Sequence, residues 1–353
     1  MLTKIIIRNY KCFIDAELRL KRLNLFAGAN SSGKSSAIQA LRLCLDNAGK
    51  PQGQTVQMAS RDRKTGRFSE LRSFLTNQKE FFINLSTTDG ELKTSYTFAD
   101  DAMTLTNVII ESAPSTVAST LSAMPVFYLP ANRESAKDVF PMNMEAESPL
   151  GPSGEYVIDY FAHHSGDVLD DSLIYDKSLW TLEGQVNYWL RQLTGYTLQV
   201  KPQGETYIVR YKNIFGRELR PYHVGTGVSF ISAMLIVCLS ISEGGLVIIE
   251  NPEIHLHPKA QALAMDFFSM IASAERQLII ETHSDHLFNG VRRLIAQKSI
   301  SVEDASILFF RMQDMQESRP VHVELTEKGR MVTYEKGLFD QFDDDLDVLL
   351  QAK

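Results

Sequence analysis

The sequence predicts an α/β fold: a mostly parallel sheet covered by helices, an antiparallel sheet in the N-terminal part and an inserted helical region. Three observations support this prediction. Between residues 228 and 310, helix-length and strand-length apolar segments alternate, as they do around parallel sheets. Near the N-terminus, short strands lead into a glycine-rich turn that opens a helix. Between these parts, Asp89-Gly90 separates two alternating segments, which is a strong signal for a β-hairpin.

The individual elements follow from the periodicity of apolar residues. Strands are expected where short apolar or alternating segments end in turn residues, at 4–8, 16–20, 23–27, 80–87, 91–98, 103–111, 126–129, 246–250, 277–281 and 305–310. Helices are expected where apolar residues recur every three to four positions, at 35–46, 155–164, 178–193, 228–242, 260–272 and 286–297.

We divide the chain into four segments on this basis. Residues 1–133 and 196–312 are expected to form the two parts of one α/β unit. Residues 134–195 are expected to be a mainly helical insertion, and residues 313–353 a small C-terminal module.

Composition and charge restrict the possible partners. Hydrophobic residues make up 44% and charged residues 22% of the chain, as in ordinary globular proteins. The net charge of −7 means that nucleic acid would need a local basic patch. The best candidate is Arg61, Arg63, Lys64 and Arg67, which we expect to be a solvated loop, so nucleic-acid binding stays open. Three scattered cysteines and no targeting segment predict a cytoplasmic protein that does not bind a membrane.

A phosphate-binding loop follows the third expected strand. The pattern G-x-x-x-x-G-K-[ST] is matched at every position by Gly28, Ala29, Asn30, Ser31, Ser32, Gly33, Lys34 and Ser35, and Ser36 follows. The glycines let backbone N–H groups turn toward phosphate oxygens, and the new helix adds its positive dipole end. Lys34 is expected to neutralise phosphate charge, and the Ser35 hydroxyl to ligate Mg²⁺. These residues therefore predict a site for ATP and Mg²⁺.

Further candidate residues follow two buried strands in the C-terminal half. The strand at 246–250 ends in Glu250-Asn251-Pro252-Glu253, and a carboxylate at such a strand end holds the Mg²⁺ shell in phosphate-loop ATPases. The strand at 277–281 leads to His283, which should lie at the carboxyl edge of the sheet. Before both, Gly225, Gly227 and Ser229 open a helix and offer a second phosphate-binding surface. An ordinary helix cap by Thr226 or Ser229 is the alternative.

In their order, these segments resemble the ABC-type ATPases of the RecF, structural-maintenance-of-chromosomes and OLD kind. The resemblance is strongest at residues 1–46 and 223–294 and in the tail. It implies an ABC-type ATPase head that forms a head-to-head homodimer or higher oligomer. ATP would then lie between the phosphate loop of one subunit and the signature residues Gly225, Gly227 and Ser229 of the other. The tail resembles small prokaryotic ATPases often encoded in antiphage defence loci, which implies a separately encoded effector as partner.

One departure from this resemblance concerns catalysis. The commonest ending of the acidic strand in these ATPases is Asp-Glu-Pro-Glu, whereas this chain has Glu250 at the metal position and Asn251 at the catalytic position. Asparagine cannot accept a proton from water, so catalysis would pass to Glu250 or Glu253, or hydrolysis would be slow. His283 resembles the switch histidine that contacts the γ-phosphate. The catalytic candidates are therefore Glu250, Asn251 and His283, and the metal ligands are Ser35 and Glu250.

The favoured function is an ATP-gated dimeric switch, the ATPase component of a prokaryotic defence system. One alternative is a DNA repair or recombination ATPase that binds duplex DNA. Another is a scaffold that binds ATP without turnover, which Asn251 motivates. A zinc site at Glu253, His255 and His257 is disfavoured, because these residues fall in a turn bounded by prolines.

Overall fold

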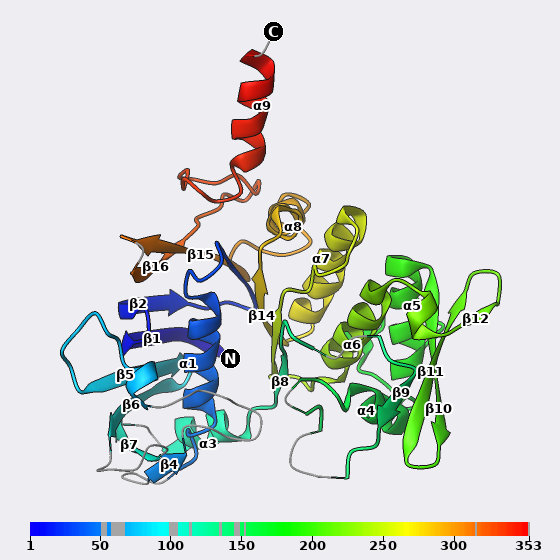
Figure 1. The fold of residues 1–353 in the computed structure, drawn as a ribbon, viewed down its shortest axis with the longest axis horizontal. Helices are drawn as coiled ribbons and strands as arrows, with labels where there is room; N and C mark the ends of the chain where they lie inside the picture. Colours follow the sequence, from blue (N-terminus) through cyan, green and yellow to red (C-terminus); the bar gives the residue numbers. More distant parts are fainter. Residues whose placement is uncertain are drawn as a thin grey trace.

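Three sheets organise the chain, and helices pack between and around them (Figure 1). The structure, a computed structural model, describes residues 1–50, 55–57, 68–98, 105–112, 115–133, 136–144, 149–151, 153–314 and 316–351. The basic cluster at 61–67 lies outside the described residues.

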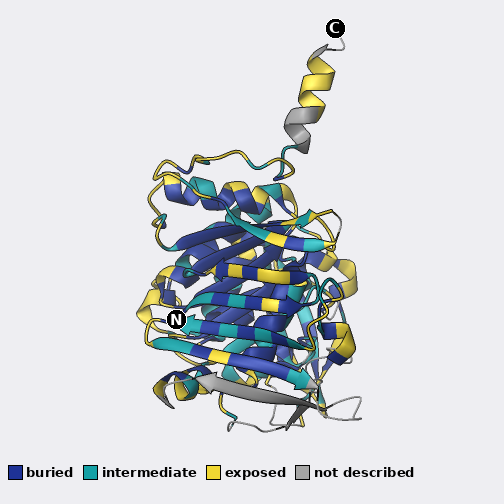
Figure 2. Cartoon of the chain, turned by 90° about the vertical axis from the view of Figure 1, so that its left-hand side faces the viewer, coloured by how far each residue is buried: buried dark blue, intermediate teal, exposed yellow. Residues whose placement is uncertain are grey.

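The N-terminal sheet is antiparallel throughout. Its strands, in spatial order, are β2 (Phe13–Arg19), β1 (Leu2–Tyr10), β5 (Glu80–Thr87), β6 (Gly90–Phe98), β7 (Leu105–Ser112) and β4 (Thr55–Gln57). The hairpin predicted at Asp89-Gly90 joins β5 to β6, and β7 extends it, so both predictions are confirmed. Burial alternates along β2 and β5 because one face of the sheet packs on the core and the other faces outward (Figure 2).

The central sheet carries the segments that the sequence pattern singled out. In spatial order its strands are β16 (Glu317–His322), β15 (Ala305–Gln313), β3 (Leu23–Gly28), β14 (Gln277–Thr282), β13 (Leu246–Glu250) and β8 (Val126–Leu129). All neighbours are parallel except β16, which pairs antiparallel with β15. Because β14 lies between β3 and β13, the phosphate loop and the ends of two acidic strands meet at one edge.

Two buried clusters cover the two faces of the central sheet. Along β14, Leu278 and Ile280 belong to one cluster, whereas Ile279 belongs to the other. The first cluster includes the C-terminal helices, and the second includes the N-terminal sheet. A strand that is buried on both faces needs a continuous apolar sequence, which explains the composition of β13 and β14.

The predicted helices are found within a few residues of their expected bounds. The described α-helices are α1 (Lys34–Leu45), α2 (Phe68–Leu71), α3 (Ser115–Ala123), α4 (Val157–His164), α5 (Leu182–Thr194), α6 (Thr226–Ser240), α7 (Pro258–Ser273), α8 (Asp285–Ala296) and α9 (Gln341–Gln351). Two short 3₁₀ turns lie at Asp171–Leu173 and Pro221–His223. Helix α5 begins at Leu182 instead of Ser178 because the Thr181 hydroxyl accepts the Gly184 N–H and caps it there.

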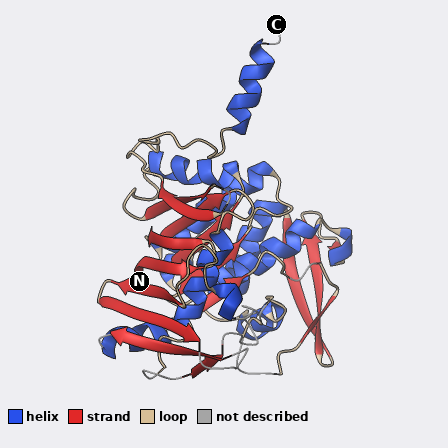
Figure 3. Cartoon of the chain, turned by 60° about the vertical axis from the view of Figure 1, so that its left-hand side comes forward, coloured by secondary structure: helices blue, strands red, loops and turns tan. Residues whose placement is uncertain are grey.

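A third, small sheet was not predicted from the sequence. It consists of β9 (Val139–Pro141), β10 (Tyr196–Gln203), β11 (Thr206–Asn213) and β12 (Glu218–Leu219). The sheet lies on the other side of the molecule from the N-terminal sheet, with helices between them (Figure 3). Because β9 falls within residues 134–195, that stretch contains a strand in addition to α4 and α5. The boundaries of the four segments stay predictions.

The last helix, α9, extends away from the rest of the molecule (Figures 1 and 2). Its apolar residues Leu346, Val348, Leu349 and Leu350 are exposed. Within the described ranges, no helix combines the length and the apolar character needed to cross a membrane.

Candidate functional site

The turn between β3 and α1 is shaped by a close approach to β16. Gly33 has a φ of 106°, and a Cβ at this position would lie 2.5 Å from Ser318 Oγ and 3.0 Å from Cys12 Sγ. Only glycine meets both conditions. The Ser318 hydroxyl also donates a hydrogen bond to the Ser32 carbonyl, so β16 supports the turn from behind.

Lys34 folds back over this turn. Its Nζ donates to the carbonyl oxygens of Gly28 at 2.9 Å and Ala29 at 2.8 Å. The same Nζ lies 3.9 Å from a carboxylate oxygen of Glu281. Burial lowers the pKa of Lys34, and the charges of Glu281 and Glu253 oppose this effect. A buried ammonium group is thus held beside the loop, where phosphate oxygens of a ligand could replace the carbonyls.

A cavity of about 620 Å³ opens against the turn, within the size range of cofactor sites. Its lining comes from the loop, from the β1–β2 turn, from α2 and the turn after it, and from the residues at the ends of β13 and β14. The residues are Lys11, Cys12, Asn30, Ser31, Ser32, Gly33, Lys34, Ser35, Ser36, Glu70, Phe74, Asn251, Glu281 and His283. The structure therefore brings most of the predicted loop together with Asn251 and His283. Gly28, Ala29 and Glu250 are not part of the lining.

Glu281 lies directly beside the loop, although sequence reasoning did not select it. The Ser35 hydroxyl donates to Glu281, with Oγ 3.0 Å from Oε1 and 3.2 Å from Oε2. Burial raises the pKa of Glu281 to about 7, the charge of Glu250 adds to this, and Lys34 and Ser35 oppose it. The available signal was the position of Glu281 at the end of an apolar strand, like Glu250 on its own strand. The register pairs the two residues.

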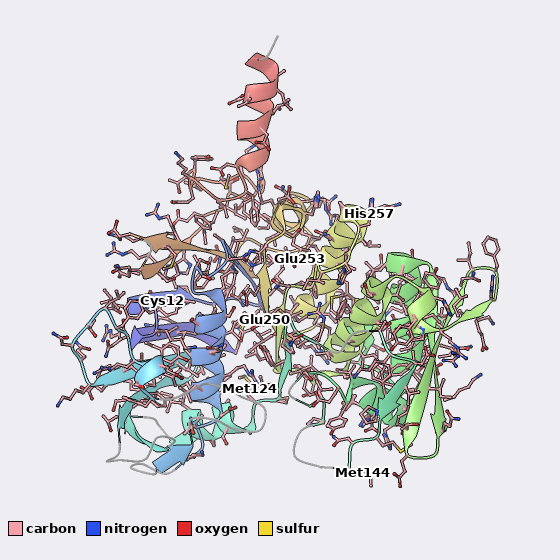
Figure 4. The ribbon with its side chains drawn as sticks, viewed as in Figure 1. Cys12, Met124, Met144, Glu250, Glu253 and His257 are labelled. Carbon is pink, nitrogen blue, oxygen red and sulfur yellow. The ribbon has the colours of Figure 1, made fainter. Side chains whose placement is uncertain are left out.

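Glu250, the predicted metal ligand, is hydrogen-bonded elsewhere. Its Oε1 accepts from the Tyr128 hydroxyl at 3.0 Å, and its Oε2 accepts from the Ala131 N–H at 3.1 Å. Arg133, which also follows β8, contacts the same strand end. Its guanidinium donates to the carbonyl oxygens of Glu250 at 2.7 Å and Asn251 at 3.0 Å. In Figure 4, Glu250 lies near the middle of the molecule, below Glu253. The carboxylate of Glu250 thus joins β13 to β8 and to the segment after it.

Asn251, Glu253 and His283 meet at the same edge. Asn251 has a φ of 46°, a conformation that asparagine tolerates, and its N–H donates to the Glu281 carbonyl at 2.8 Å. The His283 N–H donates to Glu253 Oε1 at 2.7 Å. Asn251 Oδ1 and Glu253 Oε2 are buried without a partner among the described residues, as expected of groups that serve a water or a ligand. Burial and the charge of Lys34 lower the pKa of His283, and a hydrogen bond with the backbone of Gly28 opposes this effect.

The predicted signature residues do not line this cavity. Gly225 is exposed at the start of α6, and the Ser229 hydroxyl accepts from Tyr211 at 3.3 Å. Gly227 packs so closely on the turn after β13 that a Cβ would lie 2.5 Å from the His255 carbonyl. Helix α6 therefore contacts the acidic turn of its own chain, while its exposed start is separate from the phosphate loop.

Lys11, Cys12, Glu70 and Phe74 are lining residues that sequence reasoning missed. The side chain of Phe74 is 76% exposed, yet its turn is fixed because the Ser73 N–H donates to the Asn9 carbonyl at 2.9 Å. The Lys11 N–H donates in turn to the Leu71 carbonyl at 2.7 Å. An exposed aromatic ring on a fixed turn offers a stacking surface for a base. No motif marks Phe74, because only the fold brings it to the phosphate loop.

His257 has a structural role at the start of α7, where its Nδ1 accepts from the Lys259 N–H at 3.3 Å. In the part of the chain that the structure describes, no group of three or more His, Cys, Asp or Glu side chains is arranged to hold a metal ion.

Three stretches of the chain match known family models. Residues 1–162 match the family described as "AAA ATPase domain", and residues 130–289 match "AAA domain, putative AbiEii toxin, Type IV TA system". Residues 300–349 match "Protein of unknown function (DUF3696)". No curated protein matches the chain. The two ATPase-domain matches overlap at residues 130–162 and together cover residues 1–289.

Solved structures show the fold. An SmcHead bound to the C-winged helix domain of ScpA has a TM-score of 0.59 at 14% identity, over 92% of this chain and 98% of that chain. An Smc head domain with an extended coiled coil, bound to the C-terminal domain of ScpA derived from Pyrococcus furiosus, has a TM-score of 0.56 at 11% identity. That match covers 100% of this chain and 99% of the other. The predicted α/β fold of an ABC-type ATPase head is confirmed.

Proposed function

We propose that this chain binds ATP with Mg²⁺ in the cavity at the phosphate loop and acts as an ATP-gated dimeric switch. The observation that carries the proposal is the separation of the two predicted phosphate-binding surfaces. The loop from Asn30 to Ser36 lines an open cavity, whereas Gly225 is exposed at the start of α6, outside it. A second copy in head-to-head orientation could place its own signature residues over this cavity. The nucleotide would then hold the two copies together.

The residues at the site fit a magnesium ion. Ser35 and Glu281 provide hard oxygen donors beside the loop, and Mg²⁺ usually takes one or two carboxylates together with phosphates and waters. When bound, the ion would neutralise charge on the phosphates. Lys34 is proposed to leave the carbonyls of Gly28 and Ala29 for the phosphates, and the ring of His283, which lines the cavity, to contact the γ-phosphate.

Hydrolysis is proposed to be slow. The amide of Asn251 lines the cavity at the position predicted for the catalytic base, and an amide cannot accept a proton from water. The same observation favours a second candidate function, a scaffold that binds ATP without turnover. Single-turnover measurements with purified protein distinguish the two, because the scaffold would release no phosphate.

A role in prokaryotic defence is the more specific part of the proposal. The family description for residues 130–289 names a toxin of a type IV toxin–antitoxin system, which supports such a role. The solved Smc heads hold a domain of a separate protein, ScpA, and we propose that a separately encoded effector likewise binds this head in the cytoplasm.

Light scattering with a non-hydrolysable ATP analogue and Mg²⁺ tests the switch. The parent protein should gain mass when the analogue is added. Ser229→Arg should not, because its bulk lies at the signature turn. Ser242→Arg places the same change just past the other end of α6, at an exposed residue, and should behave like the parent. An unchanged mass of the parent protein at micromolar concentrations would contradict the dimeric switch.

A further inference from the structure

Two glutamates end neighbouring strands of the central sheet, and both are candidates for binding the metal ion. Glu250 ends β13, and its partner in the register is Glu281 on β14. Phosphate-loop ATPases hold Mg²⁺ between the hydroxyl of the loop and one carboxylate at a strand end. From the sequence alone, the motif E-N-P-E predicts that the carboxylate of Glu250 has this role.

The geometry favours Glu281. Strand β14 pairs directly with β3, the strand that leads into the loop, with Thr282 opposite Ala27. The carboxylate of Glu281 consequently receives the Ser35 hydroxyl at 3.0 Å and lies 3.9 Å from Lys34 Nζ. It also lines the cavity in which the loop is exposed. Glu281 therefore touches both loop side chains that phosphate chemistry requires.

Glu250 has neither contact. It lies one strand farther from the loop, and each of its carboxylate oxygens already accepts a hydrogen bond, from Tyr128 and from the Ala131 N–H. Turning this carboxylate toward a metal ion would break both bonds and leave two half-buried donors, the Tyr128 hydroxyl and the Ala131 N–H, without this acceptor. Glu281 can share a metal ion with Ser35 without such a loss.

We propose that Glu281, and not Glu250, is the carboxylate that acts with Ser35 on a divalent cation bound together with the nucleotide. The inference rests on the proposed ATP-binding function and names Mg²⁺ as the cation, because both groups offer hard oxygen donors. Glu250 instead connects the end of β13 to β8 and to the segment after it. Since Glu281 stands two residues before His283, the contacts to the cation and to the γ-phosphate fall on one short segment.

The test measures how much Mg²⁺ tightens the binding of a fluorescent ATP analogue. Glu281→Gln and Glu250→Gln remove one charge each and keep the side-chain shape, and Glu243→Gln makes the same change at an exposed loop residue. In the parent and in Glu243→Gln, affinity should fall at least tenfold when Mg²⁺ is replaced by EDTA. In Glu281→Gln, the ratio of the affinity with Mg²⁺ to the affinity with EDTA should approach one. In Glu250→Gln, this ratio should stay as high as in the parent. Electron paramagnetic resonance of Mn²⁺ added with the nucleotide provides a second readout of cation binding.

The outcomes are distinguishable. A parent-like ratio in Glu281→Gln overturns the inference, and loss of the ratio in Glu250→Gln overturns the exclusion of Glu250. If the parent protein binds no ATP in either condition, the proposed function itself fails. Should Glu281→Gln not fold, Glu281→Asp carries the same expectation, because its shorter side chain withdraws the carboxylate from Ser35.

Discussion

Replacing Glu281 with glutamine should stabilise the ligand-free protein at neutral and alkaline pH. Glu281 is only 5% exposed. Its burial, helped by the charge of Glu250 and opposed by Lys34 and Ser35, raises its pKa from 4.5 to about 7. The folded state therefore disfavours the ionised carboxylate. Glutamine has the shape of the protonated acid and can keep a hydrogen bond with Ser35, but it carries no charge.

The sign and the size of the effect follow from proton linkage. In the unfolded chain Glu281 ionises near pH 4.5, whereas in the folded protein it keeps its proton up to about pH 7. Between these values the folded protein binds more protons than the unfolded chain, so the free energy of unfolding falls as pH rises. The contribution of Glu281 is fully present below pH 4.5 and is lost as pH rises through about 7. At 1.36 kcal/mol per pKa unit, the loss is about 3 kcal/mol.

Urea denaturation between pH 4.5 and 8 measures this effect, with a chelator present and Glu243→Gln as the matched control. Glu281→Gln and the parent should have nearly equal free energies of unfolding at pH 4.5. As pH rises, the free energy of unfolding of the variant should increase relative to that of the parent, and at pH 8 it should be about 3 kcal/mol higher. This difference is a sizeable part of the roughly 5–15 kcal/mol by which proteins are typically stable. A difference that does not change with pH, or a parent that is more stable at pH 8, would refute the reasoning.

Three further predictions concern the nucleotide. Lys34→Ala should abolish binding of a fluorescent ATP analogue while circular dichroism stays unchanged, since among the described residues the ammonium group bonds the carbonyls of Gly28 and Ala29 and pairs with Glu281. Parent-like affinity would show that the loop is misassigned. Asn251→Glu should raise steady-state phosphate release, because general-base help is worth roughly 10²–10⁴-fold where geometry permits; a well-folded variant with equal or lower turnover argues against a missing base. Phe74→Ala should weaken ATP binding about tenfold, because base stacking contributes about 1–3 kcal/mol, whereas Phe74→Tyr, which keeps an aromatic ring, should bind like the parent. Equal affinities of Phe74→Ala and the parent in a fluorescence titration would exclude stacking.

Much of the fold could be predicted because its elements depend on local patterns. The loop that precedes α1 needs glycine at position 33, and the turn between β5 and β6 needs Asp89-Gly90, so both are visible in a few residues. The continuous apolar sequences of β13 and β14 likewise predict that both strands are buried on both faces. Strand β9 of the third sheet could not be predicted in this way, because it has three residues and is defined by its pairing with β11.

The sequence by itself determined that the chain has a phosphate-binding loop, an acidic strand end and a histidine at a neighbouring strand end. Only the tertiary structure decided which acid lies beside Ser35. Glu281 reaches the loop because β14 lies next to β3, and Glu250 is held away from it by Tyr128 and Ala131, which come from a distant part of the chain. The spacing of apolar residues along a segment predicts which of its residues are buried, but it does not predict which segments become neighbours. Strand order depends on how all segments bury their apolar faces together, so the partners of a charged side chain emerge only from the folded chain.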